Sequence, residues 1–128
     1  MEAQNSTPRF ARKRVAVAVL SLLGVLGLTH IPQSAVPEGL QFRVFDKVEH
    51  AVAYGVVAGL FLLALRRPVR PVTAGLILTG LLAVGALDEV TQPLVNRVAS
   101  VSDFVADVVG IGLAGLCFTA WRRRAVGR

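Results

Sequence analysis

Residues 72–90 read VTAGLILTGLLAVGALDEV, and this stretch decides the fold class of the chain. Its first sixteen residues carry no charged side chain, and Asp88 and Glu89 then follow side by side. Apolar residues do not alternate with polar ones, which argues against a strand of a membrane barrel. A helix of this length is about as long as the hydrocarbon core of a bilayer is thick. The stretch therefore predicts a transmembrane helix that ends in two carboxylates.

Three further apolar runs of similar length predict three more helices. All six prolines fall between or beyond the runs, where a helix would have to end. The connections are short, and short connections join antiparallel neighbours. We therefore predict an all-α integral membrane protein, an antiparallel bundle of four helices at about residues 15–31, 48–65, 72–90 and 104–121.

Composition excludes several classes of protein. Of the 128 residues, 54% are hydrophobic and 17% are charged, whereas soluble domains average about 45–50% apolar and about 25% charged residues. This excludes intrinsic disorder and argues against an ordinary soluble enzyme. The length allows one domain, which we place at residues 15–121 between basic tails at residues 1–14 and 122–128. The single cysteine, Cys117, excludes an intrachain disulfide and a cysteine-based zinc site.

Basic residues are distributed unevenly along the chain. All but Arg43, Lys47 and Arg97 precede the first run, separate the second run from the third, or follow the fourth. These positions share one side of an antiparallel bundle, and the positive-inside rule assigns that side to the cytoplasm. Both termini of this multi-pass plasma-membrane protein are therefore predicted to be cytoplasmic. Membrane orientation explains the net charge of +6, so we expect the lipid bilayer as a partner and no nucleic acid.

The first run could instead be the apolar region of a cleaved signal peptide, because basic residues precede it. It is longer than the usual ~7–15 residues of such a region. The nearest small-residue site, Ser34-Ala35, has Gln33 at the −3 position and fits poorly. We therefore expect an uncleaved membrane anchor.

Acidic residues gather on the opposite, outer side of the predicted bundle. Seven of the eight lie there: Glu38, Asp46, Glu49, Asp88, Glu89, Asp103 and Asp107. Residues four apart share one face of a helix. Three sets have this spacing: Asp46 with His50 and Tyr54, Asp88 with Gln92, and Asp103 with Asp107.

The depth of these side chains makes them candidates for a functional site. An ionisable group inside the membrane costs about 2.5–3.5 kcal/mol, so it normally faces the bundle and pairs there. Asp88 and Glu89 repel each other, and the dipole at the C-terminal half of a helix disfavours both. They need compensation, from Arg97, Lys47, a protonated His50, a shared proton or a metal ion.

Simpler structural roles are open to other residues on this side. Asp46 and Asp103 lie at helix N-termini, where a carboxylate caps free N–H groups. Ser100 has capping-box spacing to Asp103. His30, at the end of the first run, is expected to be an interfacial residue.

The ordered set of polar residues resembles the VanZ-like family, small integral membrane proteins named after a teicoplanin-resistance accessory protein. The resemblance covers roughly residues 46–115 and is carried by Asp46, Lys47, His50, Tyr54, Glu89, Gln92, Arg97, Ser102, Asp103 and Gly110. The chain departs from the family at Asp107, where the family usually has Asn. The resemblance implies a cell-envelope role and, in some members, lowered susceptibility to glycopeptides. It implies no particular reaction.

One hypothesis is an enzyme that acts on a lipid-linked or cell-wall substrate at the outer leaflet. The candidate catalytic residues are His50, Glu89 and Asp103, with His50 and Glu89 as an acid–base pair. Lys47 and Arg97 could hold a phosphate or carboxylate. The other candidate substrate-binding residues are Asp46, Tyr54, Asp88, Gln92, Ser102 and Asp107. Ser100, Ser102 and Thr91 are the available hydroxyl nucleophiles, and no nucleophile-elbow, zinc-protease or P-loop motif occurs.

A second hypothesis is a binding module that captures an envelope lipid, a peptide terminus or a glycopeptide without chemical change. The absence of an evidently activated nucleophile favours it. His50 and the carboxylates could serve a metal-dependent version, although we assign no metal ligand and leave the cofactor open. The same cluster could also be a structural charge network in a non-catalytic scaffold. Charges confined to one end disfavour a monomeric transporter, an objection that a homo-oligomer would escape.

Overall fold

The computed structural model describes residues 10–35, 43–66 and 69–126, and these residues form a helical protein. The elements in chain order are α1 (Arg12–Thr29), η1 (Gln33–Ala35), α2 (Arg43–Leu63), α3 (Pro71–Thr91), η3 (Gln92–Val95) and α4 (Val101–Val126). The predicted all-α class and the four predicted helices are confirmed, with ends that differ by no more than five residues. The predicted tail up to residue 9, together with Glu38, Arg67 and Arg128, lies outside the described ranges.

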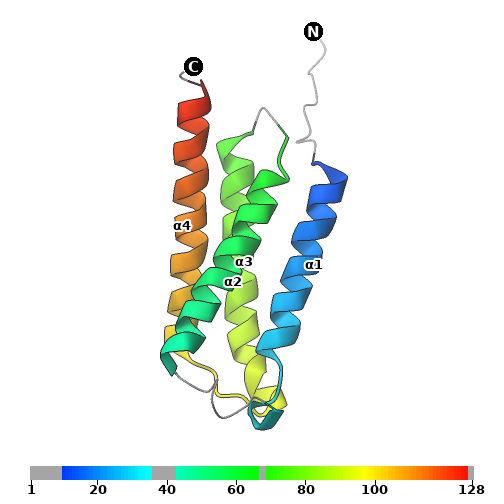
Figure 1. Cartoon of the computed structure of the whole chain (residues 1–128), viewed down its shortest axis with the longest axis vertical. Coiled ribbons are helices and arrows are strands. Elements are labelled where there is room, and N and C mark those ends of the chain that lie inside the picture. The colour runs from blue at the N-terminus through cyan, green and yellow to red at the C-terminus, as the bar shows by residue number, and fades with distance from the viewer. Residues whose placement is uncertain (1–9, 36–42, 67–68, 127–128) are drawn as a thin grey trace.

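The four α-helices run antiparallel to one another in chain order (Figure 1). α2 and α4 form the most extensive contact, α2 also packs against α1 and α3, and α3 packs against α4. The start of α1, the connection from α2 to α3 and the end of α4 lie together at one end of the bundle. We call this the basic end, and the opposite end the acidic end. The described cations of the basic end are Arg12, Lys13, Arg14, Arg66, Arg70, Arg122, Arg123 and Arg124.

Glycine allows α2 and α4 to approach until their backbones touch. A Cβ atom added at Gly110 would overlap the carbonyl oxygen of Ala51, and one added at Gly55 would lie 3.2 Å from the Gly110 carbonyl oxygen. Close approach through small residues is typical of helix pairs in membranes. It brings His50 and Tyr54, which flank Ala51 on α2, within reach of α4.

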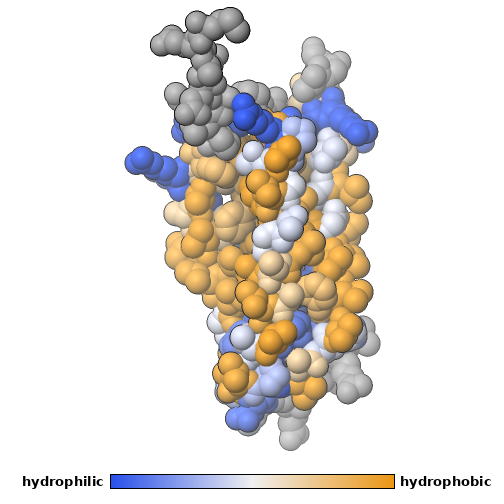
Figure 2. Space-filling view, turned by 180° about the vertical axis from the view of Figure 1, so that it is seen from behind, coloured by the Kyte–Doolittle hydropathy of each residue, from blue (hydrophilic) through white to orange (hydrophobic). Residues whose placement is uncertain are grey.

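Most large apolar side chains lie on the outside of the bundle. The larger buried apolar cluster consists of Tyr54, Val57, Ala58, Leu81 and Ile111. By contrast, Leu20, Leu76 and Leu116 are between 67% and 69% exposed. On the face drawn in Figure 2, a hydrophobic belt crosses the middle of the molecule between hydrophilic ends. An apolar surface of this extent is typical of a protein that contacts lipid or a partner.

Two segments are long and apolar enough to cross a membrane, Pro71–Val95 and Val101–Ala125. Only 17% and 22% of their most apolar windows are buried inside the protein, whereas the core helix of a soluble protein is mostly buried. α1 and α2 carry more charge, because α1 begins with three basic residues and α2 contains four charged residues in its first two turns. The structure therefore supports two candidate membrane spans.

Candidate functional site

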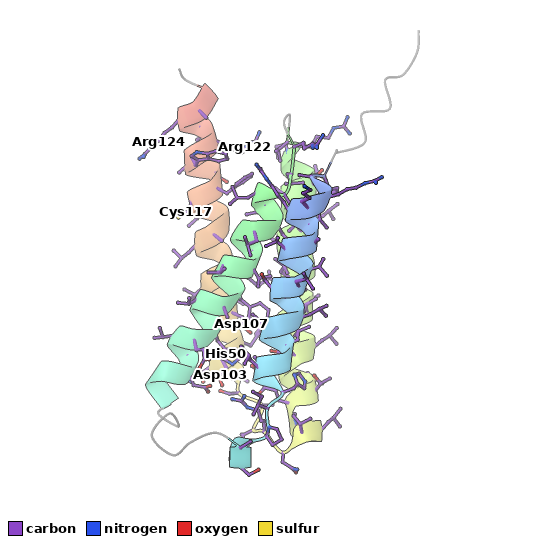
Figure 3. The ribbon with its side chains drawn as sticks, turned by 45° about the vertical axis from the view of Figure 1, so that its right-hand side comes forward. His50, Asp103, Asp107, Cys117, Arg122 and Arg124 are labelled. Atoms are coloured by element: carbon purple, nitrogen blue, oxygen red, sulfur yellow. The ribbon has the colours of Figure 1, made fainter. Side chains whose placement is uncertain are left out.

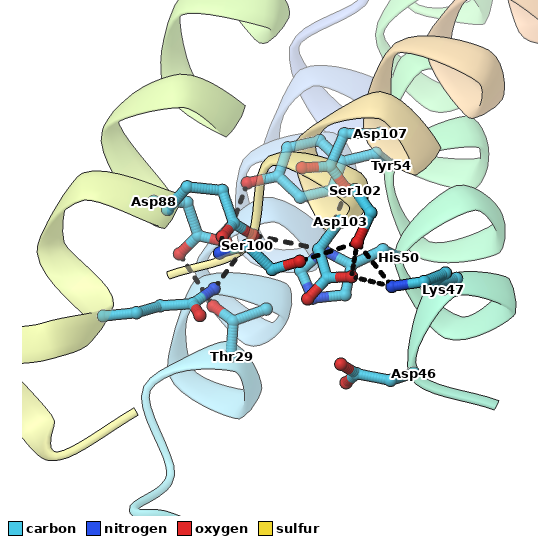
Figure 4. A network of polar contacts seen from close by, with 12 residues as sticks. Thr29, Asp46, Lys47, His50, Tyr54, Asp88, Ser100, Ser102, Asp103 and Asp107 are labelled. Carbon is cyan, nitrogen blue, oxygen red and sulfur yellow. Dashed lines mark hydrogen bonds and ion pairs between the residues drawn. The ribbon is translucent and has the colours of Figure 1, made fainter. Parts of the chain in front are cut away.

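Polar side chains are buried together at the acidic end, where all four helices contribute to one group (Figures 3 and 4). Six of them are at most 6% exposed: His50, Asp88, Glu89, Gln92, Asp103 and Asp107. We call these six and their side-chain partners the polar cluster. The partners are Thr29, His30, Lys47, Tyr54, Ser100 and Ser102.

Asp88 is fully buried near the C-terminal end of α3, where the helix dipole disfavours a negative charge. Thr29 Oγ1 donates a hydrogen bond to Asp88 Oδ1 at 2.7 Å. Tyr54 Oη donates one to Asp88 Oδ2 at 3.2 Å. His30 Nδ1 lies 3.2 Å from Asp88 Oδ1. The carboxylate is therefore compensated by donors from α1 and α2.

His30 belongs to the polar cluster, a role that the interfacial prediction missed. Its Nε2 lies 3.0 Å from Thr91 Oγ1, in addition to the contact between its Nδ1 and Asp88. The side chain is 28% exposed, so it covers the cluster from outside. The sequence held a signal for this role. Thr29 and His30 lie at the end of the first helix, and Asp88 and Thr91 lie at the end of the third, so an antiparallel bundle places all four at the same end.

His50 links α2 to α4 in the centre of the polar cluster. His50 Nδ1 lies 2.9 Å from Asp107 Oδ1, within hydrogen-bond distance. The same nitrogen lies 3.8 Å from Glu89 Oε1. Asp107 Oδ2 is buried and has no hydrogen-bond partner among the described residues. Buried polar atoms without a partner are rare in proteins and call for an explanation.

Glu89 is held by the segment that follows α3. The backbone N–H of Ser100 donates to Glu89 Oε2 at 2.9 Å, and Gln92 Nε2 donates to Glu89 Oε1 at 3.1 Å. Asn96 has a left-handed backbone conformation, with φ of 59° and ψ of 36°, which ends η3. Asparagine tolerates this conformation better than most residues. The chain then passes Arg97 and brings Ser100 back to Glu89.

Lys47 is the cation nearest to the first turn of α4. Its Nζ donates to Asp103 Oδ1 at 2.8 Å and to Ser102 Oγ at 2.6 Å. Ser100 Oγ and Ser102 Oγ share a hydrogen bond at 2.7 Å. The Asp103 side chain is 7% exposed and that of Lys47 is 43% exposed, so the carboxylate depends on this ion pair more than the ammonium does.

Arg97 closes the acidic end between α1 and α2. Its Nη1 donates to the Thr29 carbonyl oxygen at 3.0 Å and to the Leu28 carbonyl oxygen at 3.4 Å. Its Nη2 lies 3.6 Å from Asp46 Oδ1. Arg97 was one expected partner for the carboxylates at the end of α3, but its contacts in the described structure are with α1 and α2 instead.

A small cavity of about 60 Å³ opens beside the polar cluster, between α1 and α2. Apolar side chains from α1 and charged side chains from α2 meet there. The lining residues are Val25, Leu28, Thr29, Asp46, Glu49, His50, Ala53, Tyr54 and Arg97. The cavity therefore offers carboxylates, an imidazole, a phenol and a guanidinium to one small polar group.

Three ligand atoms of the cluster could approach a metal ion. Single atoms of His50, Glu89 and Asp103 lie within 4.8 Å of one another. However, Asp103 is already bound to the Lys47 ammonium, and both Glu89 oxygens accept hydrogen bonds. A metal ion would have to displace these partners, so the donor set fits a metal poorly.

The sequence-predicted site residues mostly lie together. The three candidate catalytic residues, His50, Glu89 and Asp103, are buried and adjacent. Among the candidate binding residues, Tyr54, Asp88, Gln92 and Asp107 are also buried. Lys47 of α2 and Ser102 of α4 meet at one edge of the cluster, and Asp46 and Arg97 lie at the edge near α1. Asp46 and Asp103 both occupy the first turn of their helices, as predicted.

No family model, curated protein or solved structure matches this chain.

Proposed function

We propose that this chain is a four-span integral membrane protein of the VanZ-like type, with both termini in the cytoplasm and the polar cluster on the outer side. The apolar lengths of α3 and α4 and the hydrophobic belt support membrane insertion. The concentration of cations at one end supports the orientation, because positively charged segments stay in the cytoplasm. The three basic residues of α1 and the charges of α2 lie near helix ends, where long side chains reach the interface.

The polar cluster is proposed to be a pocket that binds a ligand of the bacterial cell envelope, either lipid-linked or derived from peptidoglycan. The observation that carries this proposal is the burial of four carboxylates from α3 and α4 beside a cavity, at one end of an apolar bundle. Such burial is costly in a membrane protein, where intramembrane ionisable groups usually mark functional sites.

The cavity lining indicates what kind of group binds there. Asp46 and Glu49 favour an amine, and Arg97 favours a carboxylate or phosphate. Val25 and Leu28 offer an apolar wall from α1. A small zwitterionic group on a lipid or peptide, such as the end of a peptide stem, combines these properties.

Binding without chemical change is favoured over catalysis. Ser102 Oγ bonds with Lys47 and Ser100 in the described structure, whereas His50 is paired with Asp107. Ser102 and His50 thus do not form the usual arrangement for acyl transfer, a nucleophilic hydroxyl next to a general base. Thr91 Oγ1 does lie 3.0 Å from His30 Nε2, but this hydroxyl donates to the carbonyl oxygens of Leu87 and Asp88 in its own helix. If a reaction does occur, His50 and Glu89 are the proposed acid–base pair. The resemblance to VanZ-like proteins suggests that binding lowers glycopeptide susceptibility.

Cysteine labelling tests the topology. In a Cys117→Ser background, Val98→Cys places a thiol at a residue that is 86% exposed near the acidic end. Arg124→Cys places one at the basic end. A membrane-impermeant maleimide should label Val98→Cys in intact cells, and Arg124→Cys only after permeabilisation. The reverse pattern would contradict the proposed orientation and put the pocket in the cytoplasm.

Antibiotic susceptibility tests the function of the pocket. Cells that express the wild-type chain should survive more teicoplanin than cells with an empty vector, and Glu49→Gln and His50→Ala should remove the difference. Cys117→Ser, at an exposed residue far from the cavity, is the matched control. The alternative of a structural network predicts that phenotype and membrane abundance fall together. Loss of the phenotype at unchanged abundance would exclude that alternative.

A further inference from the structure

A second hollow, of about 870 Å³, opens at the basic end of the bundle. The start of α1, the connection from α2 to α3 and the end of α4 surround it. Five cations line it: Arg12, Lys13, Arg14, Arg66 and Arg122. The described lining residues include no carboxylate, and Leu62, Leu65, Val69, Phe118 and Trp121 supply apolar surface. The hollow therefore combines positive charge with an apolar floor.

Two of these cations are fixed by the fold. Arg14 Nη1 donates to the Leu63 carbonyl oxygen at 3.0 Å, at the end of α2. Arg122 Nη2 donates to the Val69 carbonyl oxygen at 3.0 Å, and its guanidinium carbon lies 5.9 Å from the centre of the Phe118 ring. These contacts join α1 and α4 to the segments around the α2–α3 connection. They account for Arg14 and Arg122 without a ligand.

The other three cations have no such partner. Arg12, Lys13 and Arg66 are exposed, and within the described part of the chain their side chains form no hydrogen bond or ion pair. Like charges around one hollow repel each other unless an anion neutralises them. A phosphate group suits this arrangement, because guanidinium groups bind its oxygens through paired hydrogen bonds.

An apolar groove of about 730 Å³ continues from the hollow along α1. Phe10 and Arg12 line both the hollow and the groove. The remaining groove residues are Val15, Ala16, Val19 and Leu20 of α1, Phe61 of α2 and Ile77 of α3. A free phosphate has no apolar part that could occupy this groove, whereas a phospholipid has an acyl chain that could.

We propose that the hollow and the groove together bind one anionic phospholipid, with its phosphate among Arg12, Lys13 and Arg66 and one acyl chain along α1. Basic pockets between membrane helices on the cytoplasmic side are known to attract anionic headgroups. This site lies at the opposite end of the bundle from the polar cluster. It depends on the proposed membrane insertion but not on what the outer pocket binds.

Trp121, the only tryptophan in the chain, lines the hollow and reports on its occupant. The full chain is reconstituted into vesicles of phosphatidylcholine with a minor fraction of phosphatidylglycerol. Bromine at the carbonyl end of the acyl chains of one or the other lipid, close to the headgroup, then quenches tryptophan on contact. We expect brominated phosphatidylglycerol to quench Trp121 more than brominated phosphatidylcholine at the same fraction. Equal quenching by the two lipids would overturn the proposal.

Matched variants distinguish a specific binding site for phosphatidylglycerol from general electrostatic attraction of the anionic lipid to the basic end. Arg12→Gln/Arg66→Gln removes two cations that line the hollow, and Arg123→Gln/Arg124→Gln removes two exposed cations of α4 that do not. The first pair should lower the preference for phosphatidylglycerol about tenfold or more, since it removes charge-assisted hydrogen bonds to the bound phosphate, each of which contributes about a tenfold factor or more. Arg123→Gln/Arg124→Gln should leave most of the preference for phosphatidylglycerol unchanged. Equal losses would indicate diffuse electrostatic attraction and overturn the site.

Two further experiments show whether the bound phosphate belongs to a phospholipid or to a free headgroup. Ala16→Phe fills the groove without removing charge and should also lower the preference for phosphatidylglycerol. Millimolar glycerol phosphate, a headgroup without acyl chains, should not restore the fluorescence of wild-type protein. Displacement by glycerol phosphate, or an unchanged preference in Ala16→Phe, would contradict the lipid assignment. Flotation of the vesicles checks insertion independently: a chain that fails to float contradicts the proposed membrane insertion itself.

Discussion

His50 and Asp107 join α2 to α4 through a contact of 2.9 Å between Nδ1 and Oδ1, and the second oxygen of the same carboxylate has no partner among the described residues. Only one side of the Asp107 carboxylate is thus used. Tyr54 and Gly85 surround the other side, because a Cβ atom added at Gly85 would lie 3.3 Å from Asp107 Oδ2 and 3.5 Å from Tyr54 Cε1.

Asp107→Asn should stabilise the protein. The amide oxygen can still accept a hydrogen bond from His50, and a neutral group costs less to bury than a carboxylate among other carboxylates. We expect a gain of about 1 kcal/mol, or a rise of about 3–5 °C in the Tm measured in detergent. Glu49→Gln, which neutralises an exposed carboxylate, should leave the Tm unchanged. A lower Tm for Asp107→Asn would mean that the negative charge is needed to hold His50.

The Lys47–Asp103 ion pair should behave asymmetrically. Lys47→Met leaves a buried carboxylate without its cation and should cost about 2–3 kcal/mol of unfolding free energy. Asp103→Asn leaves a cation that is 43% exposed and should cost less. The double variant should be more stable than Lys47→Met alone. Urea unfolding of the four proteins in micelles measures this cycle, and additive costs would show that the pair is not coupled.

Gly110→Ala should separate α2 from α4. Its methyl group would overlap the Ala51 carbonyl oxygen, and overpacking of this kind costs about 1–3 kcal/mol or more. Gly112→Ala is the matched control, because nothing lies within 4 Å of a Cβ atom added there. It should be neutral or slightly stabilising, since alanine favours helices. Thermal unfolding of both variants tests this, and equal Tm values would argue against backbone contact at Gly110.

Metal ions should have little effect on the polar cluster. Lys47 already neutralises Asp103, and Glu89 already accepts two hydrogen bonds. We expect the same Tm with a chelator and with added Zn²⁺ or Mn²⁺. A rise of several degrees with one of these ions, lost in His50→Ala, would show instead that His50, Glu89 and Asp103 form a metal site.

The helices and the composition of the site could be predicted from the sequence because each depends on local patterns. Apolar length and proline positions located α3 as residues 72–90, close to Pro71–Thr91 in the structure. Spacing of four residues correctly grouped His50 with Tyr54 and Asp103 with Asp107, and all four are buried. Asp88 and Glu89 place two negative charges near a helix C-terminus, and this correctly indicated that both carboxylates need partners.

The partners themselves could not be predicted, because they depend on how the helices turn relative to one another. The compensators expected for Asp88 and Glu89 were Arg97, Lys47, a protonated His50, a shared proton or a metal ion. Thr29, Tyr54 and His30 surround Asp88 instead. The backbone N–H that Ser100 provides to Glu89 has no signature in a side-chain pattern. It depends on the left-handed conformation of Asn96, which redirects the chain after η3.

Ligand binding by purified protein in lipid nanodiscs tests the central claim most directly. The probe is a polyprenyl-linked cell-wall precursor that carries its peptide stem, added to wild type, Glu49→Gln, His50→Ala and Cys117→Ser. We predict saturable binding to wild type and Cys117→Ser, and binding at least about tenfold weaker to the two cavity variants. Glu49→Gln keeps the result interpretable, because its exposed side chain should not affect folding. Equal binding by all four proteins would contradict the claim that the cavity beside the polar cluster is a ligand site.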